Sequence, residues 1–95
     1  MFVRVVRFTD ATPDRLDGLL ARIREAGGPP PGVSTTRLQV LADAEQSTAV
    51  VLQYFDTADD MAESGRVFAA MDASETPGTR VSVDTCEMKL DVTPS

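Results

Sequence analysis

Two stretches of the chain are apolar at both alternating sets of positions, and this pattern constrains the fold more than any other. In residues 2–8 one set holds Phe2, Val6 and Phe8 and the other holds Val3 and Val5. In residues 47–55 the sets are Ala49, Val51 and Phe55, and Val50, Leu52 and Tyr54. A strand with one face in water alternates apolar and polar side chains, whereas burial on both faces gives this pattern. Both stretches are therefore predicted to be central strands that are covered on both sides.

The first strand is followed by signals for a helix start. Thr12-Pro13-Asp14 offers an N-cap hydroxyl, a proline in the first turn and an acid that complements the helix dipole. Gly27-Gly28 supplies the stop. The apolar residues between them share one helical face and are Leu16, Leu19, Leu20 and Ile23. The spacing predicts an amphipathic helix that ends at the Gly-Pro-rich connection 27–32.

A second helix is predicted after the second apolar strand. Thr57 and Asp60 stand at capping-box spacing, and acids occupy the positive end of the helix dipole. The inner stripe of this helix is predicted to hold Met61, Ser64, Phe68 and Met71. Two further strands are predicted over residues 33–41 and 80–92, because both stretches carry strand-forming residues bounded by turn signals.

The order of these elements predicts an α+β, ferredoxin-like βαββαβ fold, with residues 1–95 forming a single domain. Right-handed crossovers give an antiparallel four-stranded sheet in the order 4-1-3-2, with both helices on one face. Two helices on one face leave the other face open, although the central strands are apolar on both. We therefore expect a homodimer in which a second copy covers the open face. The alternative is a lone subunit with an unusually apolar surface.

Composition excludes several classes of partner. The 95 residues are 42% hydrophobic and 25% charged, which is typical of a globular domain. The net charge is −6 and the arginines are scattered, so we expect no nucleic-acid binding and no attachment to an anionic membrane. The chain has no apolar run of membrane-spanning length and no leader pattern at its start, which predicts a cytoplasmic protein.

The chain contains no histidine, no asparagine and no tryptophan. Without histidine there is no imidazole to ligate haem or zinc and none to activate a serine or a cysteine. The single cysteine, Cys86, excludes an internal disulfide and a multi-cysteine metal site, and is predicted to be a thiol packed in a strand rather than a reactive nucleophile. We therefore expect no metal and no cofactor.

The remaining candidates for chemistry are arginines, carboxylates and Tyr54. Arg4 shares a face with Phe8 in a central strand, so its charge needs either an acid or a ligand, and Asp84 and Glu87 are the acids expected nearby. The Tyr54 hydroxyl could donate a proton or hold an enolate oxygen, or it could simply pack with its hydroxyl satisfied. Arg37 and Gln53 are expected to form hydrogen bonds in the dimer interface, with ligand binding as the alternative.

Several short motifs resemble the antibiotic biosynthesis monooxygenase family of the dimeric α+β barrel superfamily, over nearly the whole chain. They are Phe8, the helix start 12–16, Pro31-Gly32-Val33, Tyr54-Phe55-Asp56-Thr57 and Val81-Ser82-Val83-Asp84. The resemblance implies a pocket between the second helix and the sheet. Haem-degrading members use an asparagine, a tryptophan and a histidine, for which this chain has Val6, Phe55 and the Met71-Asp72 region. Haem degradation by that mechanism is therefore not expected.

The leading hypothesis is a homodimeric barrel that binds a small aromatic or polyketide-like ligand. The expected pocket residues are Val6, Phe8, Phe55, Ser64 and Phe68. The resemblance implies cofactor-independent monooxygenase activity, with Arg4 or Tyr54 stabilising a substrate enolate. The alternative is a non-catalytic binding, structural or regulatory dimer module, in which the core is solid and Arg4 is paired with an acid.

Overall fold

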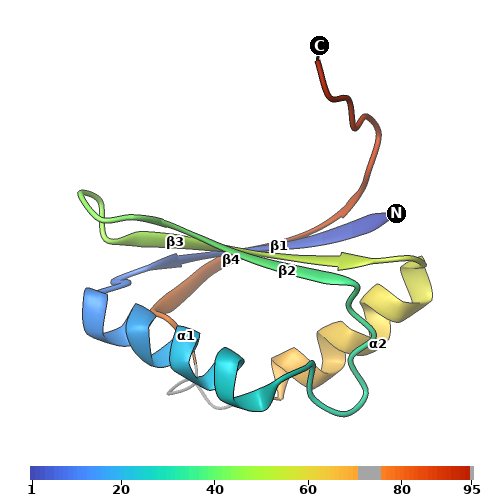
Figure 1. Ribbon diagram of the computed structural model, residues 1–95. Coiled ribbons are helices and arrows are strands. Elements are labelled where there is room, and N and C mark those ends of the chain that lie inside the picture. Colours follow the sequence, from blue (N-terminus) through green and yellow to red (C-terminus); the bar gives the residue numbers. More distant parts are fainter. Residues whose placement is uncertain (71–75, 95) are drawn as a thin grey trace.

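The computed structural model describes residues 1–70 and 76–94, and its regular elements follow the predicted order of strands and helices (Figure 1). The elements are β1 (Phe2–Thr9), α1 (Pro13–Ala26), β2 (Arg37–Asp43), β3 (Thr48–Phe55), α2 (Ala58–Ala69) and β4 (Thr79–Glu87). The predicted α+β class and the βαββαβ order are confirmed. Met71, expected on the stripe of α2, and Asp72 lie outside the described residues.

The four strands form one open antiparallel sheet in the order β2-β3-β1-β4, which reads 4-1-3-2 from the β4 edge. The two doubly apolar strands, β1 and β3, are the central pair, with Val6 opposite Val51. Both helices lie on the same face of the sheet (Figure 1). The opposite face carries no helix among the described residues. We call the two faces the helix-covered face and the helix-free face, and each side chain of the sheet points to one or the other.

Both helices begin where the capping signals predict. The Thr12 hydroxyl accepts a hydrogen bond from the backbone N–H of Arg15, and the Thr57 hydroxyl accepts one from the N–H of Asp60. At the end of α1, Gly27 has φ 68°, a left-handed conformation that glycine adopts without a steric penalty. Helix α1 therefore stops where the sequence predicts.

Strand β2 begins at Arg37 rather than at Val33, which corrects the predicted bounds. Residues 33–36 instead form the end of the connection that follows α1. The Ser34 N–H donates to the Ser64 hydroxyl of α2, and the Thr36 N–H donates to the Tyr54 carbonyl. These bonds tie the connection to both α2 and the end of β3, so this segment leaves the regular ladder.

Strand β4 ends at Glu87, five residues before the predicted end at Val92. It is an edge strand that pairs with β1 alone among the described residues, and β1 begins at Phe2, which is opposite Glu87. One further bond, from the Met88 N–H to the Met1 carbonyl, closes the pairing. Beyond this bond the chain pairs with no strand of the described part, and it leaves the sheet on the side away from the helices (Figure 1).

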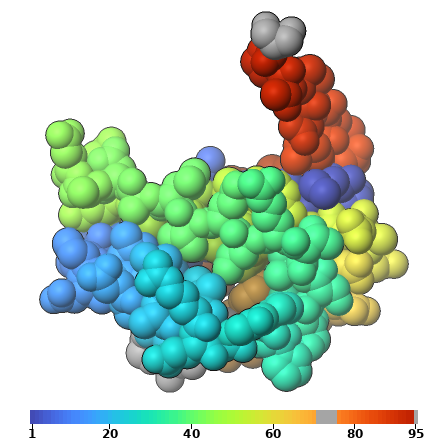
Figure 2. Space-filling model, viewed as in Figure 1, coloured from blue at the N-terminus to red at the C-terminus, as the bar shows by residue number. Residues whose placement is uncertain are grey.

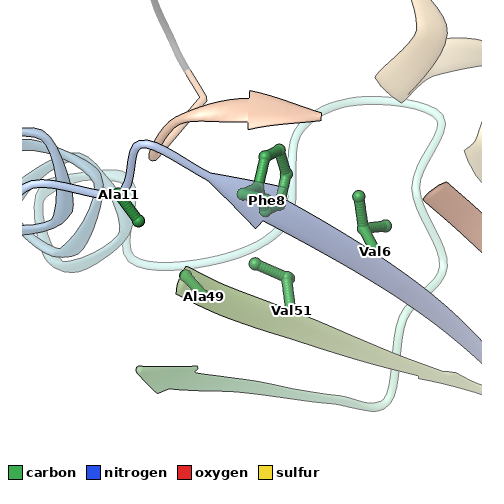
Figure 3. Packing of buried hydrophobic residues seen from close by; sticks show 5 residues of the cluster. All are labelled: Val6, Phe8, Ala11, Ala49 and Val51. Carbon is green, nitrogen blue, oxygen red and sulfur yellow. The ribbon is translucent and has the colours of Figure 1, made fainter. Parts of the chain in front are cut away.

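The buried apolar cluster lies between the sheet and the start of α1. Its members come from β1, β3 and the turn after β1, and are Val6, Phe8, Ala11, Ala49 and Val51 (Figure 3). Helix α2 contributes the buried residues Met61 and Ser64, whereas α1 has no buried residue. Helix α1 thus packs less closely on the sheet than α2 does. No helix of the described residues has the length and apolar character needed to span a membrane.

Candidate functional site

A cavity of about 770 Å³ lies between the sheet, α1 and the connection that follows α1. Figure 2 shows its opening between α1, the connection and the β2 edge of the sheet. The volume falls in the range of small-molecule pockets, roughly 300–1,000 Å³. The space exists because the Gly-Pro-rich segment 27–32 carries the chain across the sheet without packing onto it, and because α1 buries none of its own residues.

The wall of the cavity is mostly apolar. Its main apolar side chains come from the sheet and both helices, and are Val6, Phe8, Leu19, Ile23, Val51 and Phe68. The polar side chains in the sheet part of the wall are those of Arg4, Gln53 and Arg80. Arg37, at the start of β2, also borders the cavity, but its guanidinium lies over the Tyr54 ring on the other face. An apolar enclosure with a few converging polar groups is the usual form of a site for a small organic ligand.

The five residues predicted to bind ligand do not all lie on this cavity. Val6, Phe8 and Phe68 line it. Phe55 and Ser64 are fully buried, with 0% of their surface exposed, and do not line it. Ser64 instead accepts the hydrogen bond of the Ser34 N–H at 3.2 Å, so it fixes the connection against α2. The cavity is thus centred under α1 and the connection, and α2 contributes Phe68 to it.

Arg4 is 5% exposed, at the centre of the helix-covered face. Its Nη1 donates to Gln53 Oε1 at 3.0 Å, and its guanidinium carbon lies 5.1 Å from the centre of the Phe68 ring. Burial lowers the pKa of the Arg4 guanidinium, and the positive charge of Arg80 lowers this pKa further. Arg4 is therefore a buried cation whose described side-chain partners are a neutral amide and an aromatic ring.

The predicted ion pair of Arg4 with Asp84 or Glu87 is wrong. Asp84 lies opposite Val5 in the β1–β4 register, so its side chain projects to the helix-free face, where Arg7 Nη1 donates to it at 2.7 Å. Glu87 lies at the end of β4 and accepts a hydrogen bond from Lys89 at 3.0 Å. The alternation of side chains along a strand separates Arg4 from Asp84, although the two are near neighbours in the sheet.

Tyr54 lies on the helix-free face and does not join Arg4 at the cavity. Its hydroxyl donates to Gln39 Oε1 at 2.7 Å, and the guanidinium carbon of Arg37 lies 5.7 Å from the centre of its ring. The tyrosine hydroxyl is therefore satisfied within the sheet. Of the two predicted catalytic residues, Arg4 faces the cavity and Tyr54 faces away from it.

Two further expectations need correction. Gln53 was expected in a dimer interface, but it is 5% exposed on the helix-covered face, where it accepts the hydrogen bond from Arg4. Cys86 was expected to be packed, but it is an exposed free thiol on the edge strand β4. Within residues 1–70 and 76–94, no group of histidine, cysteine or acidic side chains is arranged to hold a metal ion.

Three parts of the site were not predicted from the sequence: Arg80, the α1 residues Leu19 and Ile23, and the connection after α1. Leu19 and Ile23 lie on the predicted apolar face of α1, for which no role in a pocket was predicted. The available signal was the run Gly-Gly-Pro-Pro-Pro-Gly, because such a stiff segment cannot bury side chains as a helix would. Arg80 stands opposite Phe8, next to the bulge that shifts the β1–β4 register, so simple alternation along β4 does not place it.

Comparison with family models, with curated proteins and with solved structures finds no match for this chain. The resemblance to the antibiotic biosynthesis monooxygenase family therefore stays a prediction from short motifs. The cavity and the two faces of the sheet are the features of the molecule that bear on its function.

Proposed function

We propose that this protein is a homodimer that binds a small aromatic molecule in the cavity under α1. The observation that carries the binding proposal is the cavity of about 770 Å³, which is large enough for a fused-ring molecule and has a mostly apolar wall. The rings of Phe8 and Phe68 belong to that wall and offer surfaces for stacking. The alternative of a non-catalytic module with a solid core and an acid-paired Arg4 has less support, since Arg4 pairs with Gln53.

A thermal-shift experiment tests the binding proposal. Anthrone- and naphthol-type compounds should raise the melting temperature, because a ligand that binds only the native state stabilises it. The variant Ile23→Trp, which places a large ring in the cavity, should lose the shift. The matched control Ala21→Trp, at an exposed position of the same helix, should keep it. No shift with any ring compound, or the same shift in both variants, would refute binding at this cavity.

The reaction implied by the family resemblance is cofactor-independent oxygenation of the bound ring. For an anthrone-type compound, dioxygen would convert the ring CH₂ to C=O and leave one water, which balances the two oxygen atoms. Arg4 is the predicted catalytic residue that faces the cavity, and its guanidinium would stabilise the enolate oxygen. Oxygen uptake with anthrone should exceed that of buffer and fall in Arg4→Met. Binding without uptake would assign the chain to the alternative of a binding module.

The homodimer proposal is supported by the helix-free face. Val5, Val50 and Leu52 lie together on it and are partly exposed, and Leu41 on the neighbouring strand is 53% exposed. Charged groups, among them the Arg7–Asp84 pair, lie on this face beside the apolar patch. An apolar centre with a polar margin is typical of a protein interface, and the same patch on a second copy would cover it symmetrically.

The C-terminal segment gives a second, independent reason to choose a second copy as the occupant. Residues 88–94 leave the sheet on the helix-free side (Figure 1), and Leu90 and Val92 are 78% and 68% exposed. An apolar arm on the same side as an apolar face has nothing of its own chain to cover among the described residues. It would lie along a partner seated on that face, so each subunit would hold the other.

Sedimentation velocity at micromolar concentration tests this arrangement. The wild-type chain should sediment as a dimer, and Leu52→Glu should sediment as a monomer, because a carboxylate would be buried at the centre of the interface. The control Ala21→Glu, on the exposed side of α1, should remain dimeric. Deletion of residues 90–95 should weaken the dimer. A wild-type monomer would refute the homodimer and leave the binding proposal standing.

A further inference from the structure

The described wall of the cavity is positively charged, although the protein as a whole is acidic. The chain has 15 acidic and 9 basic residues and a net charge of −6. Nevertheless, Arg4, Arg22 and Arg80 line the cavity, whereas the guanidinium of Arg37 lies over the Tyr54 ring on the helix-free face. No aspartate or glutamate of the described residues lines the cavity. The charge of the cavity wall thus has the opposite sign to the net charge of the protein, so the overall composition does not explain it.

Arg4 lines this space, and one edge of its guanidinium donates to no described residue. Its Nη1 is used by Gln53, and its Nε and Nη2 donate to no other described residue. Within residues 1–70 and 76–94, no fully buried side-chain nitrogen or oxygen lacks a hydrogen-bond partner. Nε and Nη2 therefore keep some accessible surface, and the cavity is the space that the Arg4 side chain lines. These two N–H groups form the edge with which a guanidinium binds a carboxylate through two parallel hydrogen bonds.

Arg80 adds a second cation from the neighbouring strand. It stands opposite Phe8 in the β1–β4 register, lines the same cavity and lies close enough to Arg4 to act on its charge. The ion pairs of the described residues, Arg7–Asp84 and Lys89–Glu87, include neither arginine. Arg80 itself is exposed, but its charge still repels that of the buried Arg4. An anion between the two guanidinium groups would relieve the repulsion and offset the desolvation of Arg4.

We propose that the ligand of this cavity is an aromatic carboxylate. Its carboxylate binds the Nε–Nη2 edge of Arg4 with Arg80 as the second cation, and its rings lie against the apolar wall that includes Val6, Phe8 and Phe68. This inference rests on the proposed binding function and adds the charge of the ligand to it. Gln53 holds the guanidinium through Nη1, and Phe68 lies over its face, so the free edge is oriented before the ligand arrives.

The test compares two probes with the same ring system and a substituent of similar size, the anionic anthraquinone-2-carboxylate and the neutral anthraquinone-2-carboxamide. By isothermal titration calorimetry, the carboxylate should bind the wild-type protein at least tenfold more tightly than the carboxamide. Arg4→Met should abolish this preference and leave carboxamide binding in place. Arg80→Met, at an exposed position where folding is not at risk, should reduce the preference severalfold. The control Arg24→Met, an exposed arginine of α1 outside the cavity wall, should leave it unchanged.

The outcomes separate the two proposals. Equal affinity for the two probes, or a preference that survives in both Arg4→Met and Arg80→Met, would overturn the assignment of an anionic ligand while leaving aromatic binding intact. Failure of both probes to bind would overturn the anionic assignment and the proposed function together. A preference lost in both variants and kept in Arg24→Met supports the inference.

Discussion

Arg4 and Arg7 stand three positions apart on the same strand and have opposite environments. Arg4 is 5% exposed, donates to the neutral amide of Gln53, and its guanidinium pKa is lowered by burial and by Arg80. Arg7 lies on the helix-free face and pairs with Asp84, and their side chains are 53% and 55% exposed. The odd spacing along an alternating strand is what sends the two guanidinium groups to different faces.

The difference between the two arginines shows where charge stabilises the fold and where it has another use. An exposed ion pair costs little desolvation and contributes little stability. A buried arginine without an acid loses its hydration and gains no comparable attraction in return. A chain under selection for stability alone has no reason to keep Arg4, and this supports a role in binding. The following experiments test this contrast between the two faces.

The largest effect is expected in the packed core of the helix-covered face. Phe55 is 0% exposed, and Phe55→Ala should lower the free energy of unfolding by about 3–5 kcal/mol, because it removes buried surface and leaves a void. Urea denaturation at one fixed protein concentration measures this. Leu38→Ala, on the same face but 38% exposed in the edge strand, should cost about 1 kcal/mol. Equal losses of unfolding free energy in the two variants would contradict the assignment of Phe55 to the core and of Leu38 to its margin.

The next effect concerns Arg4 itself and has the opposite sign. The double substitution Arg4→Met/Gln53→Leu should raise the free energy of unfolding by about 1–4 kcal/mol, because it replaces a desolvated charge and its amide with apolar groups of similar size. Arg4→Met alone should gain less, since it leaves the Gln53 amide without its donor. A loss of stability in the double variant would show that the pair supports the fold, and would remove the argument for a binding role.

The fold could be predicted from the sequence because its signals are local and agree with one another. Thr12 and Thr57 cap the helices as expected, and the doubly apolar strands are the central pair. The strand ends at Val33 and Val92 were wrong, because pairing depends on where the neighbouring strand begins and ends. Strand β4 stops at Glu87 because its partner β1 starts at Phe2, which lies opposite Glu87. The end of β4 therefore depends on a residue about eighty positions away in the sequence, and local signals do not show it.

The site was harder to predict, because it depends on register and on the distance between layers. Asp84 looked like a partner for Arg4 until the register placed it opposite Val5. The apolar face of α1 packs on the buried cluster at Leu16 and Leu19, but it also borders the cavity at Leu19 and Ile23. Periodicity shows which side of a helix is apolar, and it does not show how closely that side packs.

A smaller effect is expected where α2 is linked to the connection after α1. The Ser64 hydroxyl accepts from the Ser34 N–H at 3.2 Å, and Ser64→Ala should cost about 1 kcal/mol of unfolding free energy, since the buried end of this bond is lost. Ser82→Ala is a matched control on the helix-free face and should stay within about 0.5 kcal/mol of the wild type. Equal effects in the two variants would argue against a tie between the connection and α2.

The smallest effect belongs to the exposed pair. A double-mutant cycle with Arg7→Gln and Asp84→Asn should give a coupling energy of about 0.2–1 kcal/mol that falls as salt is raised, because both side chains stay hydrated. In the proposed homodimer this pair lies beside the apolar patch, so the value should not change when Leu52→Glu separates the subunits. A coupling of about 3 kcal/mol or more, lost in Leu52→Glu, would mean that the partner covers the pair completely. Arg7 would then be a buried charge like Arg4, and the contrast between the two faces would hold only for the separate subunit.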